Sequence, residues 1–257
     1  MLKYPVNMIL LISLATLSVV LALKGIIGWV LAILIVHIVV GVIIYGCSVL
    51  SSGFFMRVSC RGSSKQKSVA LTFDDGPYDG QTPTVLDILK EENVPAVFFC
   101  IGKHIRGSEP VVKRMVEEGH IVANHSYSHG FLFDMKSSRA MLDDIHQADD
   151  MIYTATGLRP KLFRPPYGVI NPALTKAIKR GGYQPVGWSI RSFDTRATSS
   201  EALTQRVIRK LHPGAVILLH DRCELTVAAL RQIIHEIRRE GYSFERADRL
   251  LQLTPYA

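Results

Sequence analysis

Two long apolar runs occupy the first fifty residues of the chain. Residues 6–23 and residues 26–50 contain no Asp, Glu or Arg, and only Lys24 and Gly25 separate them. Each run reaches the roughly 20 residues that a helix needs to cross a bilayer. The pattern predicts a membrane anchor over residues 1–56, formed by a hairpin of two transmembrane helices.

A cleaved signal peptide is the rival interpretation of this segment, since Lys3 precedes an apolar stretch. The second run is about 25 residues long, whereas the apolar region of a signal peptide has about 7 to 15. No clean small-residue cleavage site follows before Arg57. One long tilted helix is the other alternative. The hairpin is favoured, and membrane lipid is the partner expected along residues 6–50.

The segment after the apolar runs, residues 57–67, is small, polar and basic. It suits a linker that lies against anionic head groups. Its basic residues are Arg57, Arg61, Lys65 and Lys67. A single hydrophobic core stops growing at about 250 to 300 residues, so residues 68–257 are predicted to form one domain.

After residue 68, short apolar runs alternate with helical patterns. The β-prone runs lie at residues 69–73, 96–101, 120–123, 162–164, 184–190 and 215–220, and the helical patterns at residues 84–92, 110–118, 138–156, 172–180, 200–211 and 226–240. This alternation predicts an α/β fold of parallel strands with crossover helices. Six or seven such units are compatible with a barrel-like closure or with an open doubly wound sheet.

Composition narrows the range of partners. The formal net charge is +8, but the basic residues are scattered and form no stripe interleaved with aromatic residues, so no nucleic acid partner is expected. The four cysteines show no CxxC spacing, so neither a disulfide framework nor a thiolate zinc site is indicated. No protein partner is inferred.

Polar clusters follow the predicted strands, at the position where parallel β/α folds place their active sites. Asp74 and Asp75 stand where the first run meets a Gly-Pro turn. On an extended backbone adjacent carboxylates point in different directions, so one can bind a metal while the other acts as a base. His125 and His129 are four residues apart, which would put both imidazoles on one face of a helical turn. Together they offer a His, His, Asp set that leaves coordination positions open, as catalytic zinc sites do.

Three more clusters follow later runs. They contain Arg164 in Arg-Pro-Pro-Tyr-Gly, Asp194 after Trp188, and His220 at the end of Ile-Leu-Leu-His. In isolation each suits a structural role, such as a buried arginine, a turn cap or a histidine at the edge of the core. Their joint placement at strand ends favours a functional role.

The order of these motifs closely resembles the polysaccharide deacetylases, the carbohydrate esterase family of chitin, chitooligosaccharide and peptidoglycan N-acetylglucosamine deacetylases. The motifs are TFDDGP (72–77), HSYSH (125–129), RPPYG (164–168), the stretch 188–194 and ILLH (217–220), and the resemblance runs from about residue 68 to residue 241. It implies a distorted (β/α) barrel with about seven units. It also implies a metal-dependent hydrolase that removes N-acetyl groups from an N-acetylated sugar in a glycan, an oligosaccharide or a lipid-linked saccharide.

The resemblance implies a metal site and a base. Asp75, His125 and His129 match the metal ligands of the family. The expected cofactor is one divalent ion, Zn²⁺ first, with Co²⁺, Ni²⁺, Mn²⁺ or Fe²⁺ as alternatives. Asp74 matches the catalytic base, and Arg164 matches the arginine that pairs with that base.

The remaining roles follow in the same way. His220 matches the general acid, and Asp194 the carboxylate that tunes it. The backbone N–H near Tyr167 matches an oxyanion donor, and Leu218 a wall of the pocket for the acetyl methyl group. Many members have Asp-Trp in the fourth motif, whereas here the indole comes earlier, at Trp188, so long-polymer specificity does not carry over. Tyr167, Trp188 and Leu218 are the expected substrate-binding residues.

An inactive, membrane-anchored glycan-binding protein of the same fold is the alternative function. Loss of a metal ligand, the base or the acid would have favoured it, yet Asp74, Asp75, His125, His129 and His220 are all present. The presence of all five residues favours an active enzyme over an inactive binding protein.

The side of the membrane is predicted from the charges that flank the hairpin. Two crossings put both flanks on one side, where Lys3, Arg57, Arg61, Lys65 and Lys67 stand against the single Lys24 on the other. An excess of Lys and Arg marks the cytoplasmic side. The count favours a cytoplasmic catalytic domain at a bacterial-type inner or plasma membrane. The external face stays open, because the resembling enzymes mostly act on wall polymers and long domains translocate largely regardless of charge.

Overall fold

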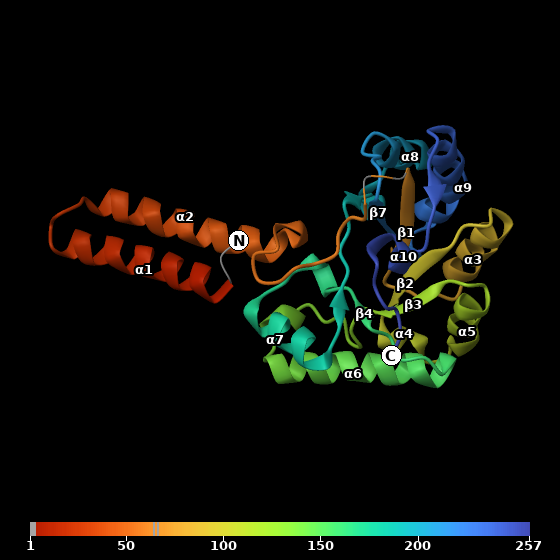
Figure 1. The fold of residues 1–257 in the computed structure, drawn as a ribbon, viewed down its shortest axis with the longest axis horizontal. Helices are drawn as coiled ribbons and strands as arrows, with labels where there is room; N and C mark the ends of the chain where they lie inside the picture. The colour runs from red at the N-terminus through yellow and green to blue at the C-terminus, as the bar shows by residue number, and fades with distance from the viewer. Residues whose placement is uncertain (1–3, 64, 66) are drawn as a thin grey trace.

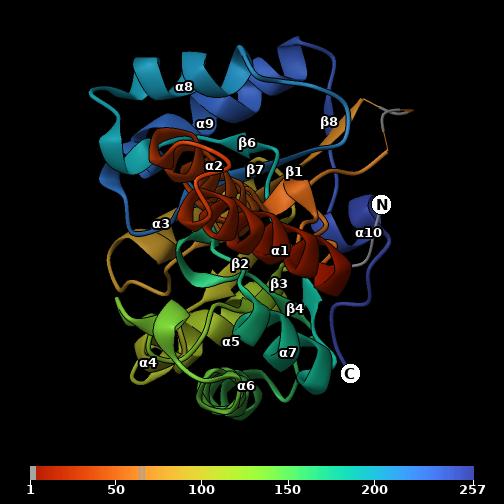
Figure 2. The ribbon, with the colours of Figure 1, turned by 90° about the vertical axis from the view of Figure 1, so that its left-hand side faces the viewer.

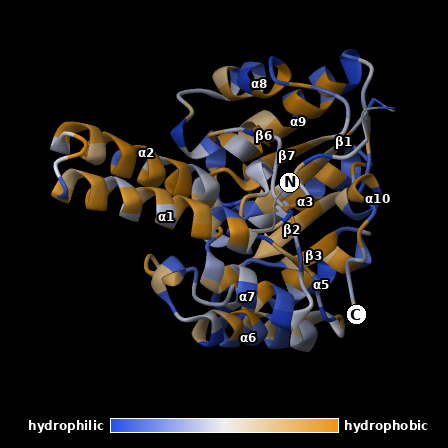
Figure 3. Cartoon of the chain, turned by 60° about the vertical axis from the view of Figure 1, so that its left-hand side comes forward, coloured by the Kyte–Doolittle hydropathy of each residue, from blue (hydrophilic) through white to orange (hydrophobic). Residues whose placement is uncertain are grey.

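The computed structural model describes residues 4–63, 65 and 67–257, so Lys3 lies outside the described residues. Helices α1 (Tyr4–Leu23) and α2 (Trp29–Ser48) form an antiparallel pair that extends away from an α/β domain (Figure 1). Figure 3 shows that both helices consist mostly of hydrophobic residues. Both are long and apolar enough to cross a membrane, by length and composition, and little of either is buried inside the protein. An uncovered apolar surface of this kind is typical of contact with lipid or a partner.

One curled sheet of parallel strands forms the domain. Its strands are β1 (Ser68–Asp74), β2 (Ala96–Cys100), β3 (Ile121–Asn124), β4 (Leu162–Phe163), β5 (Gln184–Pro185), β6 (Ile190–Arg191), β7 (Ala215–His220) and β8 (Ser243–Phe244). The order is β5-β4-β3-β2-β1-β7-β6, with β8 paired to the start of β1, and every pairing between these strands is parallel. The predicted α/β class and barrel-like closure are confirmed.

Helices cover the sheet in the predicted alternation. They are α3 (Gln81–Glu91), α4 (Gly102–Ile105), α5 (Glu109–Glu117), α6 (Ser138–Thr156), α7 (Pro172–Gly181), α8 (Ser200–Ile208), α9 (Glu224–Arg239) and α10 (Ala247–Leu251), with 3₁₀ turns η1 (Leu50–Ser52), η2 (Phe133–Met135), η3 (Pro166–Gly168) and η4 (Asp194–Arg196). Side-chain caps fix where three of these helices begin. Ser137, Asn171 and Ser199 each accept a hydrogen bond from the backbone N–H three residues on, which caps α6, α7 and α8.

The prediction of one strand over residues 184–190 is wrong. Residues 184–185 form β5, which pairs with β4 at one edge of the sheet. Residue 190 starts β6, which pairs with β7 at the opposite edge. In between, the N–H of Val186 donates to Phe163 O and the N–H of Ser189 donates to Val216 O. The segment thus bridges the two edges and closes the curl. An apolar run looks like one strand because the pattern does not say which neighbour each residue pairs with.

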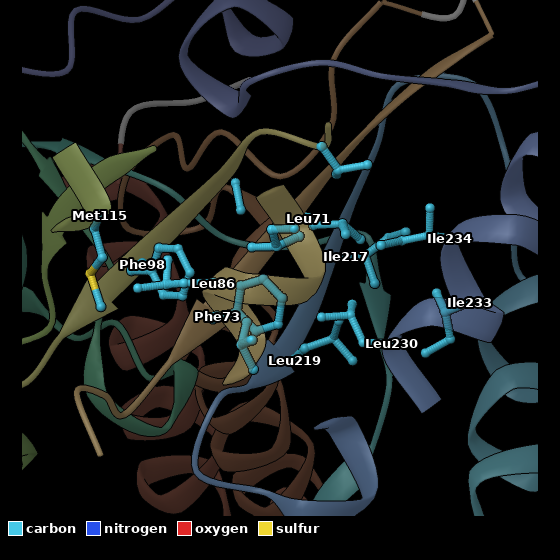
Figure 4. Close-up of a cluster of buried hydrophobic side chains, with 14 of the residues drawn as sticks. Leu71, Phe73, Leu86, Phe98, Met115, Ile217, Leu219, Leu230, Ile233 and Ile234 are labelled. Atoms are coloured by element: carbon cyan, nitrogen blue, oxygen red, sulfur yellow. The ribbon is translucent and has the colours of Figure 1, made fainter. Parts of the chain in front are cut away.

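A buried apolar cluster holds the sheet against its helices. Leu71, Phe73, Phe98 and Ile217 of β1, β2 and β7 are at most 1% exposed, and they pack with side chains such as Ile233 of α9 (Figure 4). Each such side chain contributes about 1.5–3 kcal/mol on burial. The cluster fixes the strands whose carboxyl ends carry the polar motifs.

A second cluster joins the apolar hairpin to the domain. Leu50, Phe55 and Val58 are buried together with Phe163 and Ile170. The N–H of Ile170 donates to the carbonyl of the α2 residue Cys47 at 2.9 Å. The end of α2 is therefore fixed against the loop that follows the Arg-Pro-Pro-Tyr-Gly motif. Figure 2 looks toward the hairpin, whose helices lie in front of the domain.

Part of the predicted linker is also held by the domain. Ser59 forms a bridge with Val186, and the N–H of Gly62 donates to Gly214 O at 2.8 Å. These contacts run along the segment that closes the curl and the turn that precedes β7. The connection between α2 and β1 is therefore held at more than one point.

Candidate active site

The polar motifs meet at the carboxyl end of the sheet. The register places Asp74 opposite His220, because β1 and β7 are neighbours. A cavity of about 220 Å³ opens there. The predicted residues that line it are Asp74, Asp75, His125, His129, Tyr167, Trp188, Leu218 and His220, and the other two, Arg164 and Asp194, are buried. The structure thus brings together all of the residues singled out in the sequence.

Asp75, His125 and His129 form a compact set of possible metal ligands. Their donor atoms lie within 4.8 Å of one another. Oδ1 of Asp75 is 3.7 Å from Nε2 of His125 and 3.6 Å from Nε2 of His129. Burial, aided by the neighbouring His125, lowers the pKa of His129 to about 4, so this imidazole is neutral near pH 7.

The hydrogen bond of His125 fixes which nitrogen faces the carboxylate. Its Nδ1 lies 2.8 Å from the carbonyl oxygen of Arg164. A carbonyl only accepts, so Nδ1 carries the hydrogen, and in the neutral ring Nε2 presents a lone pair toward Asp75. Lone pairs of an imidazole and a carboxylate that face each other in this way repel, and a cation between them removes the repulsion. The donor set therefore fits a divalent ion such as Zn²⁺.

The predicted helical turn over the two histidines is wrong. Residues 125–129 form a loop in which Ser126 and His129 have φ values of 66° and 43°. Asn124 and Asp144 hold this loop. Asn124 Oδ1 accepts from the N–H of Ser126 at 2.7 Å, and Asp144 Oδ1 accepts from the N–H of Tyr127 at 2.8 Å. The imidazoles converge because of this loop and not because of helical spacing.

The extended backbone expected for the aspartate pair applies only to its first member. Asp74 ends β1, but Asp75 has φ of 77°, in the left-handed region that few residues other than glycine adopt. Such strain is found mainly where the surroundings hold it, often at functional sites. The N–H of Arg222 Nε donates to Asp75 Oδ2 at 2.9 Å and leaves Oδ1 for the histidines.

The pKa of Asp75 lies below its ordinary value. Burial works to raise it, but the nearby imidazoles of His125, His220 and His129 and the Arg222 hydrogen bond together outweigh burial. The carboxylate is therefore ionised at neutral pH, as a metal ligand has to be.

Arg164 is fully buried beneath Asp74. Its Nη1 donates to Asp74 Oδ1 at 2.6 Å and to Thr72 Oγ1 at 2.9 Å, and its Nη2 donates to the carbonyl of Gly187 at 2.8 Å. The guanidinium carbon lies 4.0 Å from the ring centroid of Phe99. A buried charge is tolerated when it is paired and hydrogen-bonded in this way. The arrangement orients Asp74, whose Oδ2 lies 3.8 Å from Nε2 of His125.

His220 and Asp194 form a second buried pair. Nδ1 of His220 lies 2.7 Å from Asp194 Oδ1, and Asp194 Oδ2 accepts from Thr226 Oγ1 at 2.7 Å. Burial works to lower the pKa of His220, but the bond to Asp194 and its charge raise it above the ordinary value. For Asp194 burial acts in the raising direction, and the same bond and charge hold its pKa below the usual value. The pair thus favours a protonated imidazole that lines the cavity.

Aromatic groups form one wall of the cavity. Tyr167 has φ of 57°, and its hydroxyl donates to the carbonyl of His129 at 3.2 Å. Gly168 has to be glycine, since a Cβ there would lie 2.4 Å from the Trp188 ring. Trp188 and Leu218 line the same cavity.

Several cavity residues were not anticipated from the sequence. They are Arg222, which holds Asp75, and the lining residues Arg191, Phe193 and Arg196. An arginine two residues after a β-run carries no signal of its own, because most such residues are solvated. The proximity of Arg222 to Asp75 comes from the pairing of β7 with β1, which the sequence does not show.

Comparison with known proteins decides the family. The polysaccharide deacetylase family model matches residues 61–186, which begin after the apolar helices. The peptidoglycan-N-acetylmuramic acid deacetylase PdaA of Bacillus subtilis is 36% identical over 194 residues, covering 74% of this chain and 73% of the relative. The chain belongs to the polysaccharide deacetylase family.

Solved polysaccharide deacetylase structures share the fold. The Bc1960 peptidoglycan N-acetylglucosamine deacetylase matches with a TM-score of 0.72 and 33% identity, over 76% of this chain and 92% of the other. BA3943 of Bacillus anthracis, described as a CE4 family pseudoenzyme, matches with a TM-score of 0.70 and 30% identity, over 75% of this chain and 68% of the other. Both an enzyme and a pseudoenzyme have this fold, so an assignment of activity depends on the site.

Proposed function

We propose that this polysaccharide deacetylase is an active, metal-dependent, membrane-anchored hydrolase that removes the N-acetyl group from an N-acetylated sugar. The observation that carries the proposal is the meeting, in one cavity, of an Asp-His-His set with two oriented acid-base pairs, Asp74 with Arg164 and His220 with Asp194. The relatives support the substrate class, because their names describe deacetylation of peptidoglycan sugars.

Asp75, His125 and His129 would hold the ion, with Zn²⁺ as the first choice. When bound, the ion supplies Lewis acidity that makes water a nucleophile near neutral pH. The residues around it keep two ligands ready. The carbonyl of Arg164 fixes the tautomer of His125, and Arg222 holds the carboxylate of Asp75.

Asp74 would act as the base that takes the proton of the attacking water. Arg164 donates to Oδ1 of Asp74 and is itself held by Thr72, so Oδ2 is the oxygen left toward the cavity. A base held in one orientation avoids the entropic cost of being positioned during the reaction.

His220 would protonate the departing amine of the sugar. Asp194 accepts the hydrogen of Nδ1, so Nε2 of the protonated ring is the donor toward the substrate. The amine is a poor leaving group until it receives this proton.

Groups on the cavity wall would stabilise and place the acetyl group. The backbone N–H of Tyr167 stands at the start of η3, where first-turn N–H groups lack partners inside the helix, and would donate to the oxyanion. Leu218 would receive the acetyl methyl group, and Trp188 would contact the sugar.

The apolar hairpin would anchor the enzyme in a bacterial-type membrane as a multi-pass protein. Both helices meet the length and composition for a span, and the cluster of Leu50, Phe55 and Val58 attaches the hairpin directly to the domain. Residues 1–56 would be the anchor, 57–67 the basic connection and 68–257 the catalytic domain.

An inactive glycan-binding protein is the second candidate, because a CE4 pseudoenzyme is among the structural relatives. Acetate release decides between the two. Full-length protein loaded with Zn²⁺ should release acetate from at least one of chitooligosaccharides, peptidoglycan fragments or lipid-linked acetylated sugars, and the His220→Ala variant should not. Glycan binding without acetate release from any of them would favour the inactive protein.

A further inference from the structure

A second cavity lies between the end of the apolar hairpin and the catalytic cavity. Its volume is about 420 Å³. It is lined by residues 48–51, where α2 ends and η1 begins, and by Trp188, Ser189 and Arg191. Trp188 and Arg191 also line the catalytic cavity. The two cavities are therefore neighbours that share an indole and a guanidinium group.

The lining of this second cavity is cationic. It includes Arg61, Arg191 and Lys210, and no Asp or Glu is among the described residues that line it. In the described part of the chain, none of these three groups has a carboxylate within 4.0 Å. Like charges gathered around one cavity repel, and an anion bound among them relieves the repulsion.

Two of the cationic groups are positioned by aromatic rings. The guanidinium carbon of Arg191 lies 4.9 Å from the ring centroid of Phe193 and 5.6 Å from that of Trp188. Nζ of Lys210 lies 5.7 Å from the Phe193 centroid. Contact with a ring face orients a guanidinium while its N–H donors stay available at the edge.

Hydroxyl groups complete the lining. Ser48, Ser51 and Ser189 line the same cavity. The N–H of Val216 donates to Ser189 Oγ at 3.2 Å, so the hydroxyl hydrogen of Ser189 is left to donate elsewhere. Cationic groups combined with hydroxyl donors are the chemistry that binds phosphate oxygens.

We propose that this cavity binds the phosphate or diphosphate that joins an N-acetylated sugar to a polyprenyl carrier, while the sugar occupies the catalytic cavity. The inference rests on the proposed function and names its substrate class. A neutral acetylated sugar gives no reason for three cationic groups without a carboxylate partner beside its site, of which Arg61 donates only to the carbonyl of Pro213. The cavity lies at the end of a predicted membrane span, at residues 48–51, where the phosphate of a lipid-linked sugar is found and where its apolar tail can continue along α2.

Binding can be measured without turnover. The chain has two tryptophans, so Trp29→Phe leaves Trp188, between the two cavities, as the only tryptophan, which is excited at a wavelength that tyrosine does not absorb. Full-length protein in detergent micelles is titrated with farnesyl diphosphate, and Trp188 emission should change to saturation. Lys210→Gln in this background should raise the Kd about tenfold, as expected for loss of a charge-assisted hydrogen bond. The matched control Lys113→Gln, an exposed lysine on α5, should keep the original Kd.

Steady-state kinetics then test whether the second cavity contributes to binding of the substrate that is deacetylated. Relative to the unaltered enzyme, Lys210→Gln should raise KM for a polyprenyl diphosphate N-acetylglucosamine about tenfold more than it raises KM for chitooligosaccharides. Arg61→Gln should act in the same direction. A peptide-bearing peptidoglycan fragment, whose anions are carboxylates, should show no such extra rise.

Each result has a defined meaning. The proposal is overturned if farnesol binds as tightly as farnesyl diphosphate, if phosphatidylglycerol competes as well as the diphosphate, or if the extra rise in KM falls on the carboxylate-bearing fragment. No emission change with farnesyl diphosphate, combined with acetate release from soluble sugars, would refute the cavity but keep the deacetylase. Tight diphosphate binding without acetate release from any substrate would instead refute the proposed function.

Discussion

Asp194 accepts hydrogen bonds from His220 twice, from the side-chain Nδ1 at 2.7 Å and from the backbone N–H at 2.6 Å. The carboxylate therefore fixes both the ring and the backbone that carries it. Thr226 donates to the same carboxylate, which is fully buried. The imidazole has one orientation and one preferred tautomer, which is what a proton donor to a leaving group needs.

Replacing Asp194 with Asn should shift the pH dependence of turnover. Asp194 raises the pKa of His220, so the protonated acid persists to higher pH in the unaltered enzyme. Without the charge, the alkaline limb of kcat/KM should move to lower pH, and kcat should fall about 10²- to 10⁴-fold. Acetate release measured from pH 5 to about 10 tests this. An unmoved alkaline limb would mean that another group donates the proton.

Chelation should abolish activity, and Zn²⁺ or another divalent ion should restore it, because Asp75, His125 and His129 form the ligand set found in the described residues. His129→Ala should mimic the chelator and resist rescue by added Zn²⁺ at the concentration that restores the unaltered enzyme. Metal content by mass spectrometry accompanies the assay. Full turnover by a metal-free preparation would contradict the metal assignment.

Variants of the two adjacent aspartates should differ in how much metal they retain. Asp74→Asn should lose turnover and keep its metal, since Asp74 is engaged by Arg164. Asp75→Ala should lose both, since its Oδ1 faces the two imidazoles. Equal metal loss in the two variants would show that the roles of base and ligand are misassigned.

Asp221 should make the fold less stable as the pH rises. It is fully buried, Thr82 donates to its Oδ2 at 2.7 Å, and its Oδ1 has no hydrogen-bond partner. Burial, with the nearby charge of Asp75 as a smaller cause, raises its pKa to about 7. An unfolded Asp has a pKa of about 3.9. The contribution of Asp221 to the free energy of unfolding is therefore fully present below about pH 4, and it is lost as the pH rises through about 7.

The test of this pH dependence is thermal unfolding of the metal-free, detergent-solubilised protein from pH 4 to 8. The Asp221→Asn variant cannot ionise, so its Tm should fall less with pH than that of the unaltered protein. Parallel curves for the two proteins would rule out Asp221 as the source of the slope.

The charge count predicts that the catalytic domain faces the cytoplasm. Alkaline phosphatase fused after Ala257 should then be inactive, and a fluorescent protein fused there should be bright. The relative PdaA is a peptidoglycan deacetylase by name, and peptidoglycan lies outside the membrane. Strong phosphatase activity would place the domain on that side and refute the charge-based prediction.

Much of the fold could be predicted because burial leaves a pattern. The runs around β1, β2 and β7 are continuous and apolar, as expected for strands buried on both faces. The polar residues at their ends could be located for the same reason, and the motif order then connected Asp74 with His220 across the sheet.

The details that escaped prediction depend on tertiary contacts. The conformation of Ser126 is set by the side chain of Asn124, and the division of residues 184–190 is set by pairing with opposite edges of the sheet. Arg222 approaches Asp75 only because β7 lies beside β1. Spacing along the chain contains none of this information.

The attachment of the hairpin has a practical consequence for preparing a soluble enzyme. A truncation after residue 56, where the composition changes, would remove Leu50 and Phe55 from a cluster that contains Phe163 and Ile170. Deleting buried side chains of this size costs about 2–5 kcal/mol each. A cut before Cys47 would retain them together with the Cys47 carbonyl that accepts from Ile170, and would remove most of the apolar helices α1 and α2. The shorter truncation should aggregate less, and the loop bearing Tyr167 should keep its support.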